Sequence, residues 1–275
     1  MRKLILIVSF LSVFGSSSFS QSGADSSHYI KAFEYYDNGD YKSAAEHFSL
    51  SIKAGYKSMK SYMFRGVSEM LENELGKARV DFSTAFRMNP SNSDINFYIG
   101  RLYFVENKYD SAILYCDKAI LLDSSDADYY DCLAMSYLGL QKVSLALKKE
   151  DNAISLSPSN TIYINNRGII KQTMGMYQEA IDDFKKSLQL NPSGNTEYIN
   201  IAFCLYKLKE YKEALEICNQ VIHNNQQLPY ALFVRGQLYY DMGDTEKACL
   251  DFRQLSLQKG EYGAKGAVYL KKYCH

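Results

Sequence analysis

Apolar residues recur along most of the chain at the spacing of amphipathic helices, in paired stripes that short polar breaks separate. Within this pattern an alanine returns every 34 residues, and the series is Ala44, Ala78, Ala112, Ala146, Ala180, Ala214 and Ala248. A second small residue stands twelve positions before each alanine, as Gly66 does before Ala78. Two small residues at this spacing let two helices cross closely. The pattern therefore predicts a series of helical hairpins.

Two kinds of break punctuate the pattern. Inside the hairpins, residues such as Gly39 and Gly175 tolerate the left-handed backbone that ends a first helix. Between the hairpins, Pro90, Pro158 and Pro192 stop the second helix. The phase needs no insertion, and it predicts seven repeats across residues 25–262: 25–58, 59–92, 93–126, 127–160, 161–194, 195–228 and 229–262.

With each recurring alanine counted as position 20, the repeats resemble tetratricopeptide repeats. That family favours a small residue at position 8, Tyr at 11, Ala at 20 and an aromatic residue at 24, and Gly236, Tyr239, Ala248 and Phe252 match it in the seventh repeat. The chain departs from the family in having no Trp. The resemblance implies an all-α fold, a right-handed α-solenoid of seven helix-turn-helix repeats whose first helices line a concave face.

Residues 263–275 continue the apolar phase with interleaved lysines, including Lys265 and Lys271. A solenoid needs a polar helix over its last apolar face. We therefore expect a capping helix at residues 263–275.

The first twenty residues are typical of a targeting segment. Arg2 and Lys3 precede an apolar run that ends at Phe14, and small residues then lead to a cleavage site expected before Gln21. The run is short for a bilayer span, and no other stretch reaches transmembrane length. A buried N-terminal helix is the alternative. We expect residues 1–20 to be a signal peptide and the protein to be exported, most simply to a bacterial periplasm.

Charge and motifs narrow the functional classes. The chain carries 31 basic and 31 acidic residues, so we expect neither nucleic acid nor an anionic membrane surface as partner. No phosphate-binding glycine loop, nucleophile elbow or paired-histidine zinc helix is present. The four histidines are spread along the sequence: His28, His47, His223 and His275. We therefore predict no enzyme activity, no cofactor and no metal site.

The six cysteines are more informative, because cysteines of an exported chain can oxidise. Cys249 lies on the second helix of the last repeat and Cys274 on the helix expected to pack against it, so this pair is a candidate disulfide. Cys116 and Cys132 lie on consecutive helices and are a weaker candidate. The alternative for Cys116, Cys204 and Cys218 is that they are small buried hydrophobic residues.

In tetratricopeptide repeats, positions 2, 5, 9, 12 and 13 of the first helix face the concave surface. Transferring these positions gives an unusual number of aromatic and methionine side chains on a nominally exposed face. The resulting candidate groove contains Tyr29, Phe33, Tyr36, Met63, Met70, Phe97, Arg101, Phe104, Met135, Asn165, Phe203, Tyr206, Phe233 and Tyr240. The alternative is that several of these side chains pack between neighbouring repeats.

These observations favour a non-catalytic scaffold that binds a peptide or helical segment of another protein in its groove. The alternative is a periplasmic accessory protein that binds a polysaccharide or another envelope polymer, since aromatic rings stack on sugars as well as on peptides. Lys and Asn do not occur together at positions 5 and 9. The family's clamp for a terminal carboxylate is therefore not expected.

Overall fold

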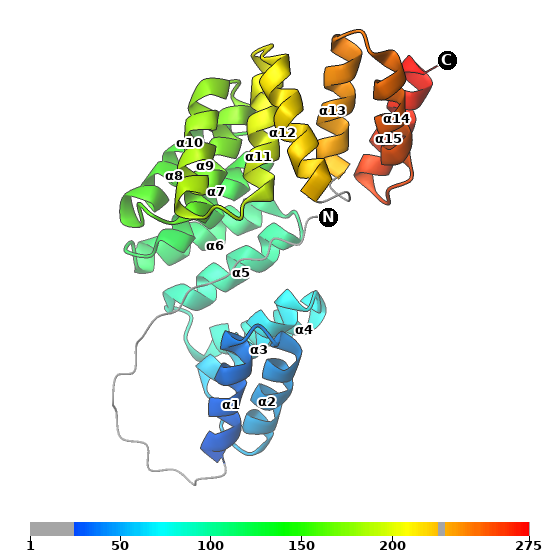
Figure 1. The fold of residues 1–275 in the computed structure, drawn as a ribbon. Helices are drawn as coiled ribbons and strands as arrows, with labels where there is room; N and C mark the ends of the chain where they lie inside the picture. The colour runs from blue at the N-terminus through cyan, green and yellow to red at the C-terminus, as the bar shows by residue number, and fades with distance from the viewer. Residues whose placement is uncertain (1–24, 225–228, 275) are drawn as a thin grey trace. The chain divides into compact units, whose positions relative to one another are not determined.

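The computed structural model describes residues 25–224 and 229–274. The described residues form fifteen α-helices and no strand (Figure 1). The predicted all-α repeat solenoid is confirmed. The predicted signal peptide at residues 1–20 lies outside the described residues.

Each repeat contributes two helices joined by a tight turn. The first helices are α1 (Asp25–Asp37), α3 (Met59–Leu71), α5 (Ser93–Val105), α7 (Ala127–Gly139), α9 (Thr161–Thr173), α11 (Asn195–Lys207) and α13 (Pro229–Asp241). The second helices are α2 (Tyr41–Lys53), α4 (Leu75–Met88), α6 (Tyr109–Leu122), α8 (Val143–Leu156), α10 (Tyr177–Leu190), α12 (Tyr211–Asn224) and α14 (Thr245–Ser256). Every first helix begins at the first residue of a 34-residue repeat.

The last helix is α15 (Glu261–Tyr273), which packs against α13 and α14. It begins two residues before the expected start of the cap at residue 263. Gly260, with a φ of 81°, precedes it. Glycine adopts this left-handed backbone conformation without steric cost. The connection between α14 and α15 therefore ends at Gly260, and α15 begins at Glu261.

The helices form two compact blocks: an N-terminal block of α1–α7 and a C-terminal block of α8–α15. Within each block, consecutive helices pack as hairpins and successive first helices also contact one another, as α5 does α7 and α11 does α13. First and second helices therefore make two layers, and the positions assigned to the groove lie on the first-helix layer.

Close helix crossing explains the small residues at position 8. A Cβ atom at Gly66, Gly168 or Gly236 would lie 2.6–2.7 Å from a ring carbon of the buried phenylalanine at position 24 of the same repeat. In the third repeat a Cβ at Gly100 would lie 2.7 Å from the Cys116 sulfur. The glycine lets the second helix approach closely enough to bury that side chain.

An ion pair between a half-buried arginine and a buried aspartate also joins the two helices of some repeats. Arg65 on α3 donates from Nε to Asp81 Oδ2 at 2.6 Å and from Nη2 to Asp81 Oδ1 at 2.7 Å. Its Nη1 reaches back to Ser49 of the preceding repeat. The same three contacts recur for Arg167 with Asp183 and Asp151, and for Arg235 with Asp251 and Asn219. The sequence contained a signal for these pairs, Arg at position 7 with Asp at position 23, which the sequence analysis did not use.

Candidate partner-binding site

Aromatic rings gather on the first-helix layer of the C-terminal block. Phe203 and Tyr206 of α11 and Tyr230 and Phe233 of α13 are all half-buried. The ring of Phe203 lies 6.4 Å from that of Tyr206 and 6.1 Å from that of Tyr230. The helical spacing of these residues and the contact between α11 and α13 bring them together.

Helix α15 extends this surface. The ring of Tyr262 lies 6.1 Å from Tyr230, and the ring of Tyr269 lies 5.3 Å from Phe233. Neither tyrosine was predicted as a groove residue: Tyr262 is the last residue of the predicted seventh repeat, and Tyr269 lies in the segment predicted only as a cap. Six residues make up what we call the C-terminal aromatic face: Phe203, Tyr206, Tyr230, Phe233, Tyr262 and Tyr269.

Two lysines stand over the rings. The Lys207 ammonium nitrogen lies 5.2 Å from the ring centre of Phe203 and 5.1 Å from that of Tyr206. Lys265 Nζ lies 5.7 Å from the ring centre of Phe233 and also forms an ion pair with Glu261 at 2.7 Å. Within the described residues no carboxylate pairs with Lys207. The face therefore combines aromatic surface with a cation available to a ligand.

A hydrogen bond holds the Tyr206 side chain of the aromatic face in place. The Tyr206 hydroxyl donates to Asp241 Oδ2 at 2.8 Å. Burial raises the pKa of Tyr206, and the bond to Asp241 raises it further, so the hydroxyl stays protonated and keeps donating. Tyr240, another predicted groove residue, is 38% exposed and packs against Tyr273 with ring centres 4.1 Å apart.

Three amide oxygens on the same layer lack donors. Asn165 Oδ1 and Gln172 Oε1 on α9 and Gln237 Oε1 on α13 are buried and accept no hydrogen bond within the described residues. The amide nitrogen of Gln237 donates to the Tyr269 hydroxyl at 3.2 Å, so only its oxygen is unused. A buried acceptor without a donor costs about 1–3 kcal/mol. These oxygens are buried in the unbound protein, so a ligand that supplies N–H or O–H groups reaches them only if the side chains turn outward.

The N-terminal block keeps fewer of the predicted groove residues accessible. Arg101 and Phe104 on α5, Tyr36 on α1 and Met135 on α7 are half-buried. The Arg101 guanidinium lies 5.5 Å from the ring centre of Phe97, and no carboxylate pairs with Arg101 in the described part of the chain.

Three predicted groove residues are core residues, which corrects the sequence analysis. Met63 is 2% exposed, Met70 7% and Phe97 4%, and all three belong to one buried cluster of the N-terminal block. Neighbouring first helices pack on one another there, and the ring of Phe97 lies 5.0 Å from that of Tyr129 on α7. These side chains are buried too deeply to contact a partner.

Tyr29 and Phe33 are neither fully buried like Phe97 nor free of packing contacts. Their rings are 5.0 Å apart, and the ring of Phe33 lies 5.1 Å from Phe48 and 4.8 Å from Phe64. Both side chains are half-buried around the small core formed by Ala32, Ala44 and Phe48. Contacts with these neighbouring rings cover most of the surface of the two side chains.

The cysteines divide into three pairs. Cys249 and Cys274 form a disulfide, with Cα atoms 5.7 Å apart, that ties the end of α15 to α14. The sulfurs of Cys116 and Cys132 lie 2.8 Å apart without a bond. Cys204 and Cys218 are buried free thiols, and burial raises the pKa of each to about 12.

Two of the four histidines lie next to each other in the structure. His28 Nδ1 and His47 Nδ1 lie 3.3 Å apart across α1 and α2, so these histidines are neighbours although they are far apart in the sequence.

The part of the chain that the structure describes contains no group of three or more His, Cys, Asp or Glu residues arranged to hold a metal ion. None of the described helices has both the length and the apolar character needed to cross a membrane.

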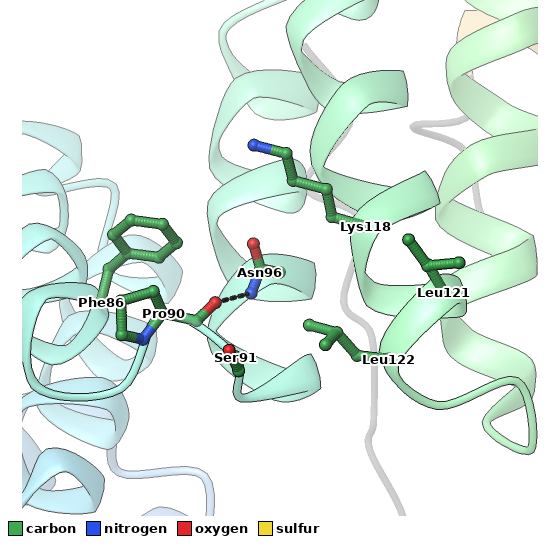
Figure 2. A pocket seen from close by; sticks show the side chains of 7 residues that line it. All are labelled: Phe86, Pro90, Ser91, Asn96, Lys118, Leu121 and Leu122. Carbon is green, nitrogen blue, oxygen red and sulfur yellow. Dashed lines mark hydrogen bonds between the residues drawn. The ribbon is translucent and has the colours of Figure 1, made fainter.

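A small pocket lies between the end of α4, the start of α5 and α6 (Figure 2). Its volume is about 240 Å³, below the roughly 300–1,000 Å³ of typical ligand sites. The Asn96 side chain at its centre already donates to the Pro90 carbonyl at 2.9 Å. The residues lining it are Phe86, Pro90, Ser91, Asn96, Lys118, Leu121 and Leu122. We assign no ligand to it.

Comparison with known families gives a consistent match. Three family models, each described as tetratricopeptide repeat, match residues 76–128, residues 163–193, and residues 198–227 with 230–257. Together they cover just over half of the chain. The human protein named tetratricopeptide repeat protein 6 is 22% identical over 199 residues, which make up 71% of this chain and 38% of that protein. The chain spans only 19–38% of the length of three such relatives.

Solved structures show the same fold. A tetratricopeptide repeat protein from Parabacteroides merdae aligns with a TM-score of 0.69 and 16% identity, over 91% of this chain and all of that one. YrrB, described as a tetratricopeptide repeat protein with an unusual peptide-binding site, aligns with a TM-score of 0.54 and 21% identity, over 70% of this chain and 98% of its own.

Proposed function

Because the chain belongs to the tetratricopeptide repeat family, whose members act as protein–protein interaction scaffolds, we propose that it holds a segment of a partner protein against the C-terminal aromatic face. We further propose that the protein is exported and works without catalysis. The observation that carries the proposal is the layer of six half-buried aromatic residues on α11, α13 and α15, with the Lys207 ammonium group over two of the rings.

Composition supports this face as the contact surface. Aromatic residues dominate the energetics of protein interfaces because they bury large areas at low cost in side-chain entropy. Lys207 adds a positive charge that can meet an acidic side chain of the partner without first breaking an internal ion pair. The N-terminal block offers a smaller surface of this kind, because Met63, Met70 and Phe97 are buried there.

The unused amide oxygens favour an extended peptide as the ligand. An extended backbone presents N–H groups along its length, whereas a helix uses its own N–H groups internally. Asn165 and Gln172 on α9 and Gln237 on α13 carry such acceptors on the first-helix layer, and Gln237 also contacts Tyr269 of the aromatic face. The relative YrrB, described as having a peptide-binding site, shares this fold, which supports the same class of ligand.

The experiment has two stages. Immobilised protein is incubated with an envelope extract, and retained proteins and glycans are identified by mass spectrometry. A synthetic peptide from the retained protein is then titrated calorimetrically against the protein and its variants. Phe203→Ala and Phe233→Ala should each weaken binding by about 1–3 kcal/mol.

Tyr198→Ala provides the matched control, because Tyr198 lies on α11, is 37% exposed and is outside the aromatic face. It should leave the affinity unchanged. Equal affinity in the face variants and the control would reject the proposed site. Retention of a glycan alone would favour a polymer-binding accessory function.

A further inference from the structure

Two sulfur atoms in the N-terminal block lie too close for an ordinary contact between thiols. The sulfurs of Cys116 on α6 and Cys132 on α7 are 2.8 Å apart. A disulfide bond measures about 2.0 Å, and two non-bonded sulfurs normally stay farther apart than the observed distance. Helices α6 and α7 pack directly against each other, so the contact belongs to the interface between the third and fourth repeats.

The other buried cysteines show that this approach is not a general property of buried thiols in this chain. Cys204 and Cys218 are equally buried, yet the described residues place no other sulfur within hydrogen-bonding distance of either. The chain also forms a disulfide elsewhere, between Cys249 and Cys274. We propose that Cys116 and Cys132 are a second oxidation site and form a disulfide between the third and fourth repeats.

The bond forms by thiol–disulfide exchange. One cysteine thiolate attacks a small-molecule disulfide such as oxidised glutathione, or the disulfide of an oxidoreductase, and releases one thiol. The second cysteine thiolate attacks the resulting mixed disulfide and releases the second thiol. Two cysteine thiols are oxidised, the oxidant disulfide is reduced to two thiols, and the two cysteine protons end on those thiols.

Burial determines when this exchange can occur. Cys116 is 0% exposed and Cys132 6% exposed, so an oxidant reaches neither sulfur once α7 has docked. Burial also raises the pKa of the Cys116 thiol well above its usual value, which suppresses the reactive thiolate in the folded protein. The bond therefore forms during folding, and after docking it resists soluble reductants.

The bond restrains α7 directly and α5 through its partner α6, and both α5 and α7 carry predicted groove residues. Arg101 and Phe104 lie on α5, which forms a hairpin with α6, whereas Met135 lies on α7. A covalent link between α6 and α7 limits how far the two repeats can separate by local opening. The inference concerns covalent structure, so its outcome is independent of whether the C-terminal aromatic face binds a partner.

The test is thiol counting after refolding. The reduced, unfolded chain is refolded with oxidised and reduced glutathione, denatured under acid quench, and alkylated with N-ethylmaleimide. We expect two alkylated residues, Cys204 and Cys218, and a proteolytic peptide that links Cys116 to Cys132. Alkylation of all four cysteines that are free in the structure would overturn the proposal, as would a link from Cys116 to any other cysteine.

Matched variants sharpen the count. Cys116→Ser should raise the number of alkylated residues from two to three, because Cys132 loses its partner, whereas Cys204→Ser should lower it to one. If Cys116→Ser fails to fold, peptide mapping of the unsubstituted protein still decides the question.

Reduction of the native protein gives an independent measure. The half-buried Cys249–Cys274 bond should open first in dithiothreitol, and the Cys116–Cys132 bond should open only when denaturant is added. Amide exchange in α6 and α7 should be slower in the oxidised protein than in the reduced protein. Equal exchange rates together with four alkylated cysteines would leave these residues as ordinary buried thiols.

Discussion

Single residues decide how closely the two helices of a repeat can pack. In four of the seven repeats position 8 is glycine, and in three of them the space that a Cβ would need is filled by the ring of the phenylalanine at position 24. The ring is fully buried, so it has little room to move aside. An added methyl group would force either the ring or the helix out of place.

Gly168→Ala should therefore lower the free energy of unfolding by about 1–3 kcal/mol. The control is Gly76→Ala on α4, where a Cβ would meet no atom within 4 Å. That substitution should raise the free energy of unfolding by about 0.4–1 kcal/mol, because alanine restricts the unfolded chain. Urea unfolding of both variants measures the difference, and effects of the same sign would contradict the packing argument.

Glu69 on α3 is the residue from which we expect pH dependence near neutrality. Burial, followed by the nearby Asp81 carboxylate, raises its pKa from 4.5 to about 7, while Arg65 and Lys77 act in the opposite direction and Glu74 adds to the increase. Glu69 Oε2 also lacks a hydrogen-bond donor within the described residues. The folded state therefore holds this proton more tightly than the unfolded chain does.

The sign of the effect follows from proton linkage. Between pH 4.5 and about 7 the folded state binds more protons than the unfolded state at this site, so stability falls as the pH rises through this range. Glu69→Gln should remove that decrease, so the variant should gain in melting temperature over the unsubstituted protein from pH 5 to pH 7, and hold a constant advantage above pH 8. Parallel profiles for the two proteins would show that Glu69 does not titrate in this range.

At the scale of elements, α15 both caps the last repeat and contributes to the candidate site. Tyr269 packs against Phe252 of α14 at 5.1 Å while also contacting Phe233 on the aromatic face. The disulfide between Cys249 and Cys274 holds the end of this helix in place. Loosening α15 should therefore affect both the stability of the block and the shape of the face.

Cys274→Ser should lower the free energy of unfolding by about 2–4 kcal/mol, because the bond closes a loop across a sequence separation of 25 residues in the unfolded chain. Cys249→Ser and the double variant should show the same loss, since each removes the same bond. Chemical denaturation of the three variants measures this. Additive losses in the double variant would mean that the two side chains contribute separately.

Helix positions were predictable from the sequence, whereas the accessibility of the candidate site was predictable only in part. Periodicity and turn residues indicated where α1, α3 and the later first helices begin, because both signals are local. Phe97 and Phe233 both stand at position 5 of their repeats, yet Phe97 is buried and Phe233 is half-buried. That difference depends on how closely neighbouring first helices pack, which no local pattern reports.

The cationic part of the site was missed for a related reason. Lys207 stands at position 13 of its repeat, a groove position, but a lysine at the end of a helix is ordinary in a sequence. Only the structure shows its nitrogen over two rings. Tyr262 was missed because it is the last residue of the seventh repeat, outside the concave-face positions, and Tyr269 was missed because its segment was interpreted only as a cap.

At the scale of the whole molecule, stability should follow the number of repeats. Each repeat packs mainly on its sequence neighbours, so removing a terminal repeat removes one interface and leaves the others intact. In the first repeat that interface includes the ring contact between Phe33 and Phe64.

A chain beginning at residue 57 should stay helical and lose roughly 1.5–3 kcal/mol from the exposure of apolar surface around Phe64. Circular dichroism should give the same helicity per residue as in the longer chain, together with a lower denaturation midpoint. A collapse of helicity throughout the shortened chain would show that the repeats do not fold as neighbouring, separable elements.

The contacts of the arginines at position 7 also determine which deletions of repeats the chain can tolerate. Repeats multiply by duplication and deletion, and a repeat that contacted its neighbours only through apolar surface could be shuffled without penalty. Arg235 instead contacts Asn219 of the preceding repeat. Deleting the sixth repeat would bring Lys185 to that place and set two positive charges together, whereas deleting the third and fourth would give Arg167 the hydroxyl of Ser83. A rearrangement of the first kind should therefore cost stability and one of the second kind should be tolerated, so the order of the repeats affects the stability of the chain.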